Sequence, residues 1–297
     1  MKTIIRLFLL VLISNQSFGQ DYNADFGKYF KEKNQEKQKE TLDKWTKSNP
    51  NDPELYTSYF NYYFNKSREE VLTLSKKEPK DEGFEFKDSL NKTAGYIGSE
   101  VNYNGIFFQK GIDKIQNGIV LFPNRLDMRF GAIYAFGEVK DWTNFTKEIV
   151  KAVKYSAINN NEWTWTNNTK QNEGKDFLLS SIQTYQLQLY NTGDDKLLNN
   201  MSEIATEILK LYPTHVESLS NLSITYMLKS DYDKAIEVLL KAESIDPKDF
   251  IVLSNVAHAY KLKGEKLKAI EYYEKAIKYG DDQAIEYSKK QIIELKK

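Results

Sequence analysis

The sequence predicts an all-α fold, an α-solenoid in which antiparallel helix pairs stack into a superhelix. Two observations predict this fold: small and apolar residues recur every 34 positions in the last third of the chain, and the apolar residues within each period have helical spacing. A third observation, an apolar N-terminal run that follows positive charges, adds a signal peptide ahead of the array. Hydrophobic residues make up 40% of the chain, which is enough for packed cores and too many for a disordered protein.

The N-terminal segment has the composition of a secretory signal peptide. Lys2 and Arg6 supply the positive charge, and an unbroken apolar run follows over 7–13. Gly19 is one of the small residues that a signal peptidase requires before its cleavage site, so we expect a signal peptide over 1–19. The apolar run is too short for a membrane-spanning helix, which takes roughly 20 residues.

Composition excludes several classes of function. The chain has 42 basic and 42 acidic side chains, and this balance argues against a nucleic-acid-binding protein, which needs a basic stripe. It has no cysteine, which excludes disulfides, a thiol nucleophile, zinc–thiolate sites and a lipid anchor on an N-terminal cysteine. We therefore expect an exported protein, periplasmic or secreted, that has no membrane span and binds no nucleic acid.

The clearest repeat lies near the C-terminus. A separation of 34 residues relates three pairs of positions: Ala235 and Ala269, Leu239 and Tyr273, and Ala242 and Ala276. Small residues at such positions let two helices approach closely, and large apolar residues cover the neighbouring pair. Pro247 ends one unit, and Gly264 suits a turn that requires positive φ. We expect clear repeats over 216–249 and 250–283, closed by an amphipathic capping helix over 283–296.

These residues resemble the tetratricopeptide repeat (TPR) family, whose signature is formed by small residues, an aromatic residue that ends the first helix, and a closing proline. The resemblance is best over 216–283. Two positions depart from the signature, because Lys266 stands where an aromatic residue is usual and Asp281 replaces the closing proline. The resemblance implies that the first helices of successive pairs line a concave groove that binds peptides.

The period weakens upstream. Pro213 lies 34 residues before Pro247 and closes another unit, and Pro123 closes an earlier one in which Gly111 and Gly118 occupy the small positions. The aromatic and Asn-rich stretch between these units falls where the phase slips. Beyond the signal peptide the chain is thus expected to divide into a degenerate helical-repeat lobe over 20–159, an insertion loop over 160–175 and a TPR lobe over 176–297.

Besides the insertion loop, one stretch further upstream breaks the period, and another is notable for its charge. Residues 79–91 contain Gly83 with alternating Phe84 and Phe86, which predicts a long loop or a short extended piece. Residues 28–44 are dense in Lys, Glu and Gln and are most simply the solvated face of the first helix.

The concave face of the two clear repeats supplies the candidate partner-binding residues. We expect eight side chains to share it: Glu217, Ser220, Ile224, Met227, Ile251, Ser254, His258 and Lys261. His258 could contact a ligand or be a partly exposed structural residue, and the structural role is favoured. Asn221 and Asn255 match groove asparagines of the family and are expected to hold helices together. The basic cluster with which some TPR grooves grip a peptide's C-terminal carboxylate is not evident.

Trp163 and Trp165 stand out in the polar insertion loop. Alternation would place both rings on one face if the segment is extended, where they could stack on a sugar or grip a partner. Alternatively both rings fold back and plug the junction between the lobes, and this interpretation is favoured.

The function expected from these patterns is binding rather than catalysis. No nucleophile–histidine–carboxylate set, phosphate loop or HExxH motif is legible, so we expect no enzymatic activity, no cofactor and no metal. We expect an exported TPR-type interaction or scaffold module that binds a peptide or protein through its concave groove. The alternative is a small-ligand or glycan-binding protein that uses Trp163 and Trp165. The Ser-Phe-Gly-Gln ending of the signal and the Asn-, Lys- and Tyr-rich composition resemble proteins of the Bacteroidetes, which implies a periplasmic or secreted site.

Overall fold

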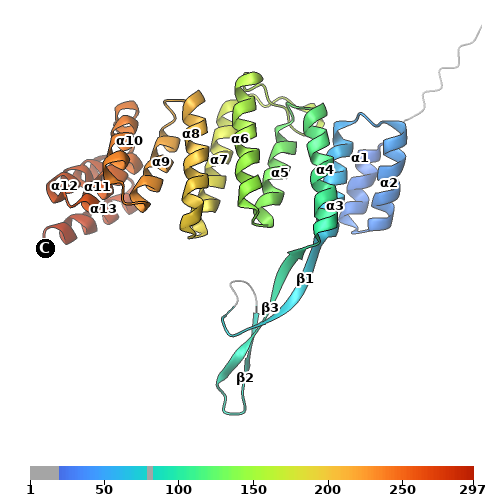
Figure 1. The fold of residues 1–297 in the computed structure, drawn as a ribbon, viewed down its shortest axis with the longest axis horizontal. Helices are drawn as coiled ribbons and strands as arrows, with labels where there is room; N and C mark the ends of the chain where they lie inside the picture. Colours follow the sequence, from blue (N-terminus) through green and yellow to red (C-terminus); the bar gives the residue numbers. More distant parts are fainter. Residues whose placement is uncertain (1–19, 79–82) are drawn as a thin grey trace, which may run out of the picture.

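A computed structural model describes residues 20–78 and 83–297. The predicted signal peptide over 1–19 therefore lies outside the described residues. Most of the described chain is an elongated row of helices that stand side by side (Figure 1). The helices form six consecutive pairs: α1 (Tyr22–Lys31) with α2 (Gln35–Ser48), α3 (Pro53–Ser67) with α4 (Gly105–Leu121), α5 (Leu126–Glu138) with α6 (Trp142–Ile158), α7 (Gly174–Asn191) with α8 (Leu198–Leu211), α9 (Val216–Leu228) with α10 (Tyr232–Ile245), and α11 (Phe250–Lys263) with α12 (Lys266–Tyr279).

Local chemistry sets the ends of the helices in the last two pairs. The carboxylates of Asp231 and Asp249 accept hydrogen bonds from backbone N–H groups of the first turns of α10 and α11. Gly264 ends α11 in the left-handed conformation, with a φ of 89°, as its position in the repeat predicts. A final helix, α13 (Asp282–Leu295), packs on α12 and covers the end of the array, so the predicted capping helix is present.

Close helix packing explains the predicted small positions upstream. A Cβ atom on Gly118 would lie 2.8 Å from the Cβ atom of Tyr56 on α3, so a larger side chain would force α3 and α4 apart. At Gly111, about two turns before, a Cβ atom would lie 3.4 Å from the backbone of Phe64. The degenerate N-terminal half therefore keeps the packing logic of the clear repeats.

The structure contains a sheet that the all-α prediction missed. Three antiparallel strands are inserted between the two helices of the second pair: β1 (Arg68–Ser75), β2 (Gly83–Lys87) and β3 (Thr93–Tyr103), in the order β1-β3-β2. The sheet projects from the helical row as an arm (Figure 1). Within the predicted loop or short extended piece over 79–91, residues 83–87 form β2 of this sheet. Leu72 and Leu74 of β1 are two positions apart, as are Phe84 and Phe86 of β2, and a search for a helical period does not detect this period of two.

The charged segment over 28–44 is also different from the prediction. It belongs to two helices, because α1 ends at Lys31 and α2 begins at Gln35. Lys33 adopts a left-handed conformation with a φ of 55°, and the Asn34 side chain accepts a hydrogen bond from the backbone of Lys37. The charged residues do lie on solvated helix faces, but the turn at Lys33 and the N-cap at Asn34 divide the segment into two helices.

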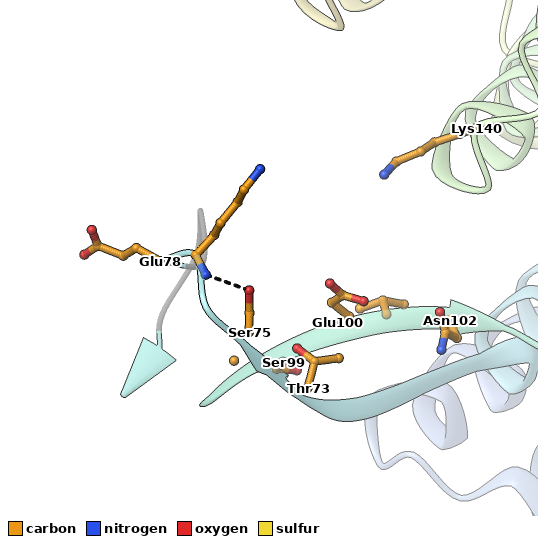
Figure 2. A pocket seen from close by; sticks show the side chains of 10 residues that line it. Thr73, Ser75, Glu78, Ser99, Glu100, Asn102 and Lys140 are labelled. Carbon is orange, nitrogen blue, oxygen red and sulfur yellow. Dashed lines mark hydrogen bonds between the residues drawn. The ribbon is translucent and has the colours of Figure 1, made fainter. Parts of the chain in front are cut away.

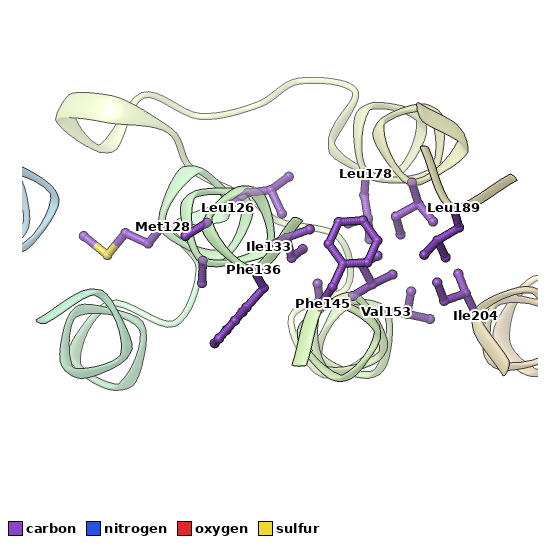
Figure 3. Close-up of a cluster of buried hydrophobic side chains, with 14 of the residues drawn as sticks. Leu126, Met128, Ile133, Phe136, Phe145, Val153, Leu178, Leu189 and Ile204 are labelled. Atoms are coloured by element: carbon purple, nitrogen blue, oxygen red, sulfur yellow. The ribbon is translucent and has the colours of Figure 1, made fainter. Parts of the chain in front are cut away.

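The apolar cores do not divide where the sequence places the lobe boundary. One continuous core extends from α3 to α8 and includes Phe145 and Val153 of α6 together with Leu178 of α7 and Ile204 of α8 (Figure 3). It therefore passes across the insertion loop at 160–175. A second core occupies α9 to α13, and a third, smaller one joins α1, α2 and α3. The change from one core to the next falls between α8 and α9.

Candidate functional site

The concave face of the C-terminal repeats is held together by its own polar side chains. Asn221 of α9 donates from Nδ2 to Oε1 of Gln183 on α7, and Asn255 of α11 donates to Oγ of Ser220 on α9 at 2.8 Å. Each asparagine therefore bridges neighbouring first helices, the structural role expected from the sequence. Ser220 is buried and its hydroxyl is engaged, so it is not available to a ligand.

Two more of the predicted contact residues are occupied. Met227 is buried in the C-terminal core. Lys261 places Nζ 3.1 Å from Oε2 of Glu294 and also donates to Oε1 of Gln291, so it ties α11 to the capping helix α13. A partner that contacts this cation has to compete with these internal bonds.

The remaining predicted residues form a mildly apolar surface. Glu217 and Ile251 are exposed, and Ile224, Ser254 and His258 are half-buried. The Nδ1 atom of His258 is buried and has no hydrogen-bond partner in the described part of the chain. Burial lowers the pKa of His258, and the nearby Lys261 lowers it further, so the imidazole is neutral at neutral pH. This part of the groove offers little charge.

A better-formed concavity lies in the N-terminal half. The first helices of three successive pairs, α1, α3 and α5, enclose it together with the insertion loop, and its volume is about 380 Å³. Its wall combines aromatic rings, amide groups and glycines, among them Asn23, Gly27, Phe30, Asn61, Gly131 and Trp165. We call this space the N-terminal cavity.

A buried ion pair network lies beside this cavity. Nη1 of Arg125 is 2.6 Å from Oε1 of Glu54, and Nη2 is 2.7 Å from Oδ2 of Asp127. Arg125 is fully buried, while Glu54 and Asp127 line the cavity. Burial opposes the charge of Arg125, but the hydrogen bonds and charges of Asp127 and Glu54 outweigh it and raise its pKa above the ordinary value.

The insertion loop is attached to this network. The backbone N–H of Asn167 donates to Oε1 of Glu54 at 2.8 Å, and the backbone N–H of Thr164 donates to the carbonyl of Asn124 at 2.9 Å. The ring of Trp165 packs edge-on against Phe177, with ring centroids 5.3 Å apart. One wall of the cavity is thus fixed by hydrogen bonds and aromatic packing.

The two tryptophans of the loop have different positions. Trp163 has no exposed surface, contacts the ring of Tyr155 and lies in the core that runs from α3 to α8. The guanidinium of Arg129 lies 4.4 Å from the ring centroid of Tyr155 and 5.6 Å from that of Trp163. The favoured interpretation is that both rings plug the junction between the lobes. Trp163 is instead buried within one continuous core, and Trp165 is half-buried and reaches the N-terminal cavity.

Sequence reasoning did not find this cavity or its ion pair. Glu54 and Arg125 are 71 positions apart, and no local pattern links them. The sequence could have suggested one part of the network, because Arg125 and Asp127 are only two residues apart and form an ion pair. The two histidines that the sequence offered lie on α11 and just before α9, far along the chain from this cavity.

A second, larger hollow lies between the projecting arm and the α5–α6 turn of the helical row. It has a volume of about 600 Å³ and is lined by polar side chains of β1 and β3, with Lys140 from the α5–α6 turn on the opposite side (Figure 2). Thr73, Ser75 and Asn102 face this space from the sheet. Its walls are largely polar.

Neither hollow has the composition of a metal site. Within the described ranges, no group of three or more His, Cys, Asp or Glu side chains could hold a metal ion. Over the same residues, none of the helices has the length and apolar character that crossing a membrane requires.

Comparison with known proteins agrees with this architecture. Residues 216–249 and 252–279 match the family model described as tetratricopeptide repeat. The chain therefore carries TPR repeats in its last third, and the fold as a whole is TPR-like and predominantly helical, with one small sheet. None of the curated proteins matches this chain.

Several solved structures are similar. They include YrrB, a TPR protein described as having an unusual peptide-binding site, at 14% identity over 84% of this chain and 97% of that chain, with a TM-score of 0.42. The TPR2AB domain of yeast Sti1, solved in complex with pHSP90, is 11% identical over 93% of this chain and 97% of its own, with a TM-score of 0.33. The Sgt2 TPR domain of Aspergillus fumigatus is 24% identical over 38% of this chain and 79% of its own, with a TM-score of 0.32.

Proposed function

We propose that this protein is an exported TPR-type interaction module that binds an extended peptide or protein segment along its concave face. The observation that carries the proposal is the N-terminal cavity, which three first helices and the insertion loop form together. Its wall is held by internal ion pairs and hydrogen bonds. A partner therefore meets a site that needs little rearrangement, and less of the binding free energy is lost to ordering.

The chemistry of the cavity suits an extended peptide. The amides of Asn23 and Asn61 can both donate to and accept from a peptide backbone, while the rings of Phe30 and Trp165 offer surface to an apolar side chain. Two carboxylates, Glu54 and Asp127, face the single guanidinium of Arg125, so the network has a net negative charge. We expect neutral or basic segments to bind in preference to acidic ones.

Gly27 provides a direct test. A Cβ atom at this position would meet no atom within 4 Å, so a large side chain can enter the cavity without disturbing the helices. We expect Gly27→Trp to abolish recovery of a stoichiometric partner from an envelope extract, whereas Gly27→Ala retains it. Equal recovery with both variants would reject the N-terminal cavity. Loss on Ile224→Asp or His258→Asp alone would move the site to the C-terminal groove.

Export is the second part of the proposal and rests on the sequence over 1–19. The positive n-region and short apolar run lead us to expect a mature protein that begins at Gln20. N-terminal sequencing of the protein recovered from fractionated cells tests this. An uncleaved chain in the cytoplasmic fraction would reject export and leave the binding proposal standing.

The glycan-binding alternative has less support. It needs two ring faces open to a sugar, and Trp163 is buried, which leaves Trp165 as the one loop tryptophan with exposed surface. Titration with oligosaccharides should leave tryptophan fluorescence unchanged. A saturable change that is lost in Trp165→Ala would favour the alternative.

A further inference from the structure

The projecting arm has one apolar and one polar face. Opposing residues of antiparallel strands point to the same side of a sheet, and the register pairs Ile97 of β3 with both Leu74 of β1 and Phe84 of β2. These three side chains therefore form a row across all three strands. Two residues lie two positions away along their strands and extend the same face: Leu72 of β1 and Phe86 of β2.

This apolar face is open to solvent. Leu72 is 83% exposed, Phe84 80% and Leu74 76%, values typical of side chains with no packing partner. Phe86 covers Gly95 of β3, where a Cβ atom would lie 2.8 Å from the ring. From their exposed fractions the five apolar side chains present on the order of 600 Å², above the few hundred Å² that a monomeric protein usually exposes in one patch.

The opposite face is polar and is turned toward the helices. Thr73, Ser75 and Asn102 lie on it and line the hollow that faces Lys140 (Figure 2). The high exposure of Leu72, Leu74 and Phe84 shows that the body of the protein does not cover the apolar face, and the arm projects away from the helical row (Figure 1). An amphipathic sheet in this position is incomplete without a second apolar surface.

We propose that the apolar face of the arm packs against the same face of a second copy of this chain, which makes the protein a symmetric dimer. Two such faces bury about 1,200 Å² in total, at the lower end of the roughly 1,200–2,000 Å² of stable, specific interfaces. Two sheets that pack face to face in this way form a core about 10 Å thick. The arm is the only contact this arrangement requires, so the N-terminal cavity of each copy stays open to its own partner.

Charge favours a second copy over a membrane surface. The segment over 68–103 contains eight acidic and six basic residues, so it carries no excess of positive charge to draw it to anionic lipid. Packing against an apolar protein surface does not require an excess of positive charge. The face itself supplies that surface, because a twofold axis brings identical rows of side chains together.

The first test compares neighbouring residues on opposite faces of β1. Sedimentation velocity of the full chain over a range of concentrations should show a monomer–dimer equilibrium. Leu74→Glu places a charge in the contact and should raise the dimer dissociation constant by roughly 100-fold or more. Thr73→Glu, on the polar face, should leave it unchanged. A wild-type chain that stays monomeric, or equal effects of the two variants, would overturn the proposal.

The second test does not depend on destabilising the arm. The chain has no cysteine, so a single introduced thiol reports only its own surroundings. Leu72→Cys should be joined into a covalent dimer by a short bismaleimide at concentrations at which Thr73→Cys is not. Absence of that selectivity would contradict the contact. Flotation of a monomeric wild-type chain with vesicles of anionic lipid would show that the face is a membrane contact and overturn the dimer.

Discussion

Glu54 and Arg125 form a buried, two-pronged ion pair that joins the second helix pair to the third. Nη1 of Arg125 donates to one carboxylate oxygen of Glu54 at 2.6 Å, and Nη2 donates to the other at 3.2 Å. Glu54 lies in the first turn of α3, whereas Arg125 precedes α5. The same guanidinium binds Asp127, and Glu54 also accepts from the insertion loop. This pair therefore fixes three segments that enclose the N-terminal cavity.

Breaking this pair should be costly. Arg125→Met removes the cation and leaves Glu54 buried beside Asp127, so we predict a loss of about 3–5 kcal/mol in the free energy of unfolding. Urea denaturation followed by tryptophan fluorescence measures it, because Trp163 and Trp165 lie in the adjoining loop. The double variant Glu54→Gln with Arg125→Met should cost less than the sum of the two single changes. Additive losses would mean that the two residues act independently.

Two glycines separate the effect of close packing from that of helix propensity. In Gly118→Ala the new methyl group would lie 2.8 Å from Tyr56 and 2.9 Å from Sδ of Met128, so we predict destabilisation of about 1–3 kcal/mol. Gly27→Ala meets no atom within 4 Å and should stabilise the protein by about 0.5–1 kcal/mol, because alanine is the better helix former. Thermal unfolding of both variants measures these two changes in stability. A stabilising Gly118→Ala would show that α3 and α4 can separate without cost.

The helical repeat could be predicted because its constraints are local and periodic. Ala235, Ala269 and Tyr273 recur at the family spacing, and each is fully buried. The left-handed turn at Gly264 and the capping helix α13 follow from the same reasoning, since glycine and amphipathic spacing are legible within a few residues.

The arm and the cavity could not be predicted in the same way. Leu72 and Leu74 alternate with a polar residue, as do Phe84 and Phe86. Such alternation usually indicates a strand with one buried face, but these side chains are exposed. The cavity depends on Glu54 meeting Arg125, and the inserted sheet lies between them in the sequence. Contacts at such separations leave no periodic signal in a single chain. The groove residues were chosen from helical spacing, which does not show that Ser220 and Lys261 have partners within the protein.

The two loop tryptophans should respond differently to truncation. Trp163→Ala removes a fully buried ring from the core, and we predict a loss of about 3–5 kcal/mol in the free energy of unfolding. Trp165 is half-buried, so Trp165→Ala should cost less stability but weaken partner binding, because its ring lines the N-terminal cavity. Denaturation measures the stability of both variants, and pull-down measures their partner binding. If Trp163→Ala were as stable as the wild type, the assignment of this ring to the core would be wrong.

The pH dependence of stability near neutrality should come from the two histidines. Burial is the main cause that lowers the pKa of His258 and of His215 below 6.5, and for His215 this effect outweighs the opposing charge of Glu217. Nδ1 of His215 also accepts a hydrogen bond from the backbone N–H of Ser218, which requires an unprotonated nitrogen. In the unfolded chain both imidazoles bind a proton near pH 6.5. Between that pH and the lower folded pKa values the unfolded state holds more protons, so stability falls as pH falls.

We therefore predict that the unfolding temperature is constant above about pH 7.5 and decreases between pH 6.5 and 5. His258→Gln should flatten this decrease, and replacing His215 as well should remove most of it. Glu207, Asp231 and Glu265 also have lowered pKa values, owing first to hydrogen bonds from lysines, but they lose their contribution as the pH falls below the ordinary carboxylate range and so act in a separate, more acidic window. Differential scanning calorimetry at half-unit intervals measures the profile. A double variant that keeps the full slope between pH 6.5 and 5 would show that the folded protein does not disfavour the charged imidazoles.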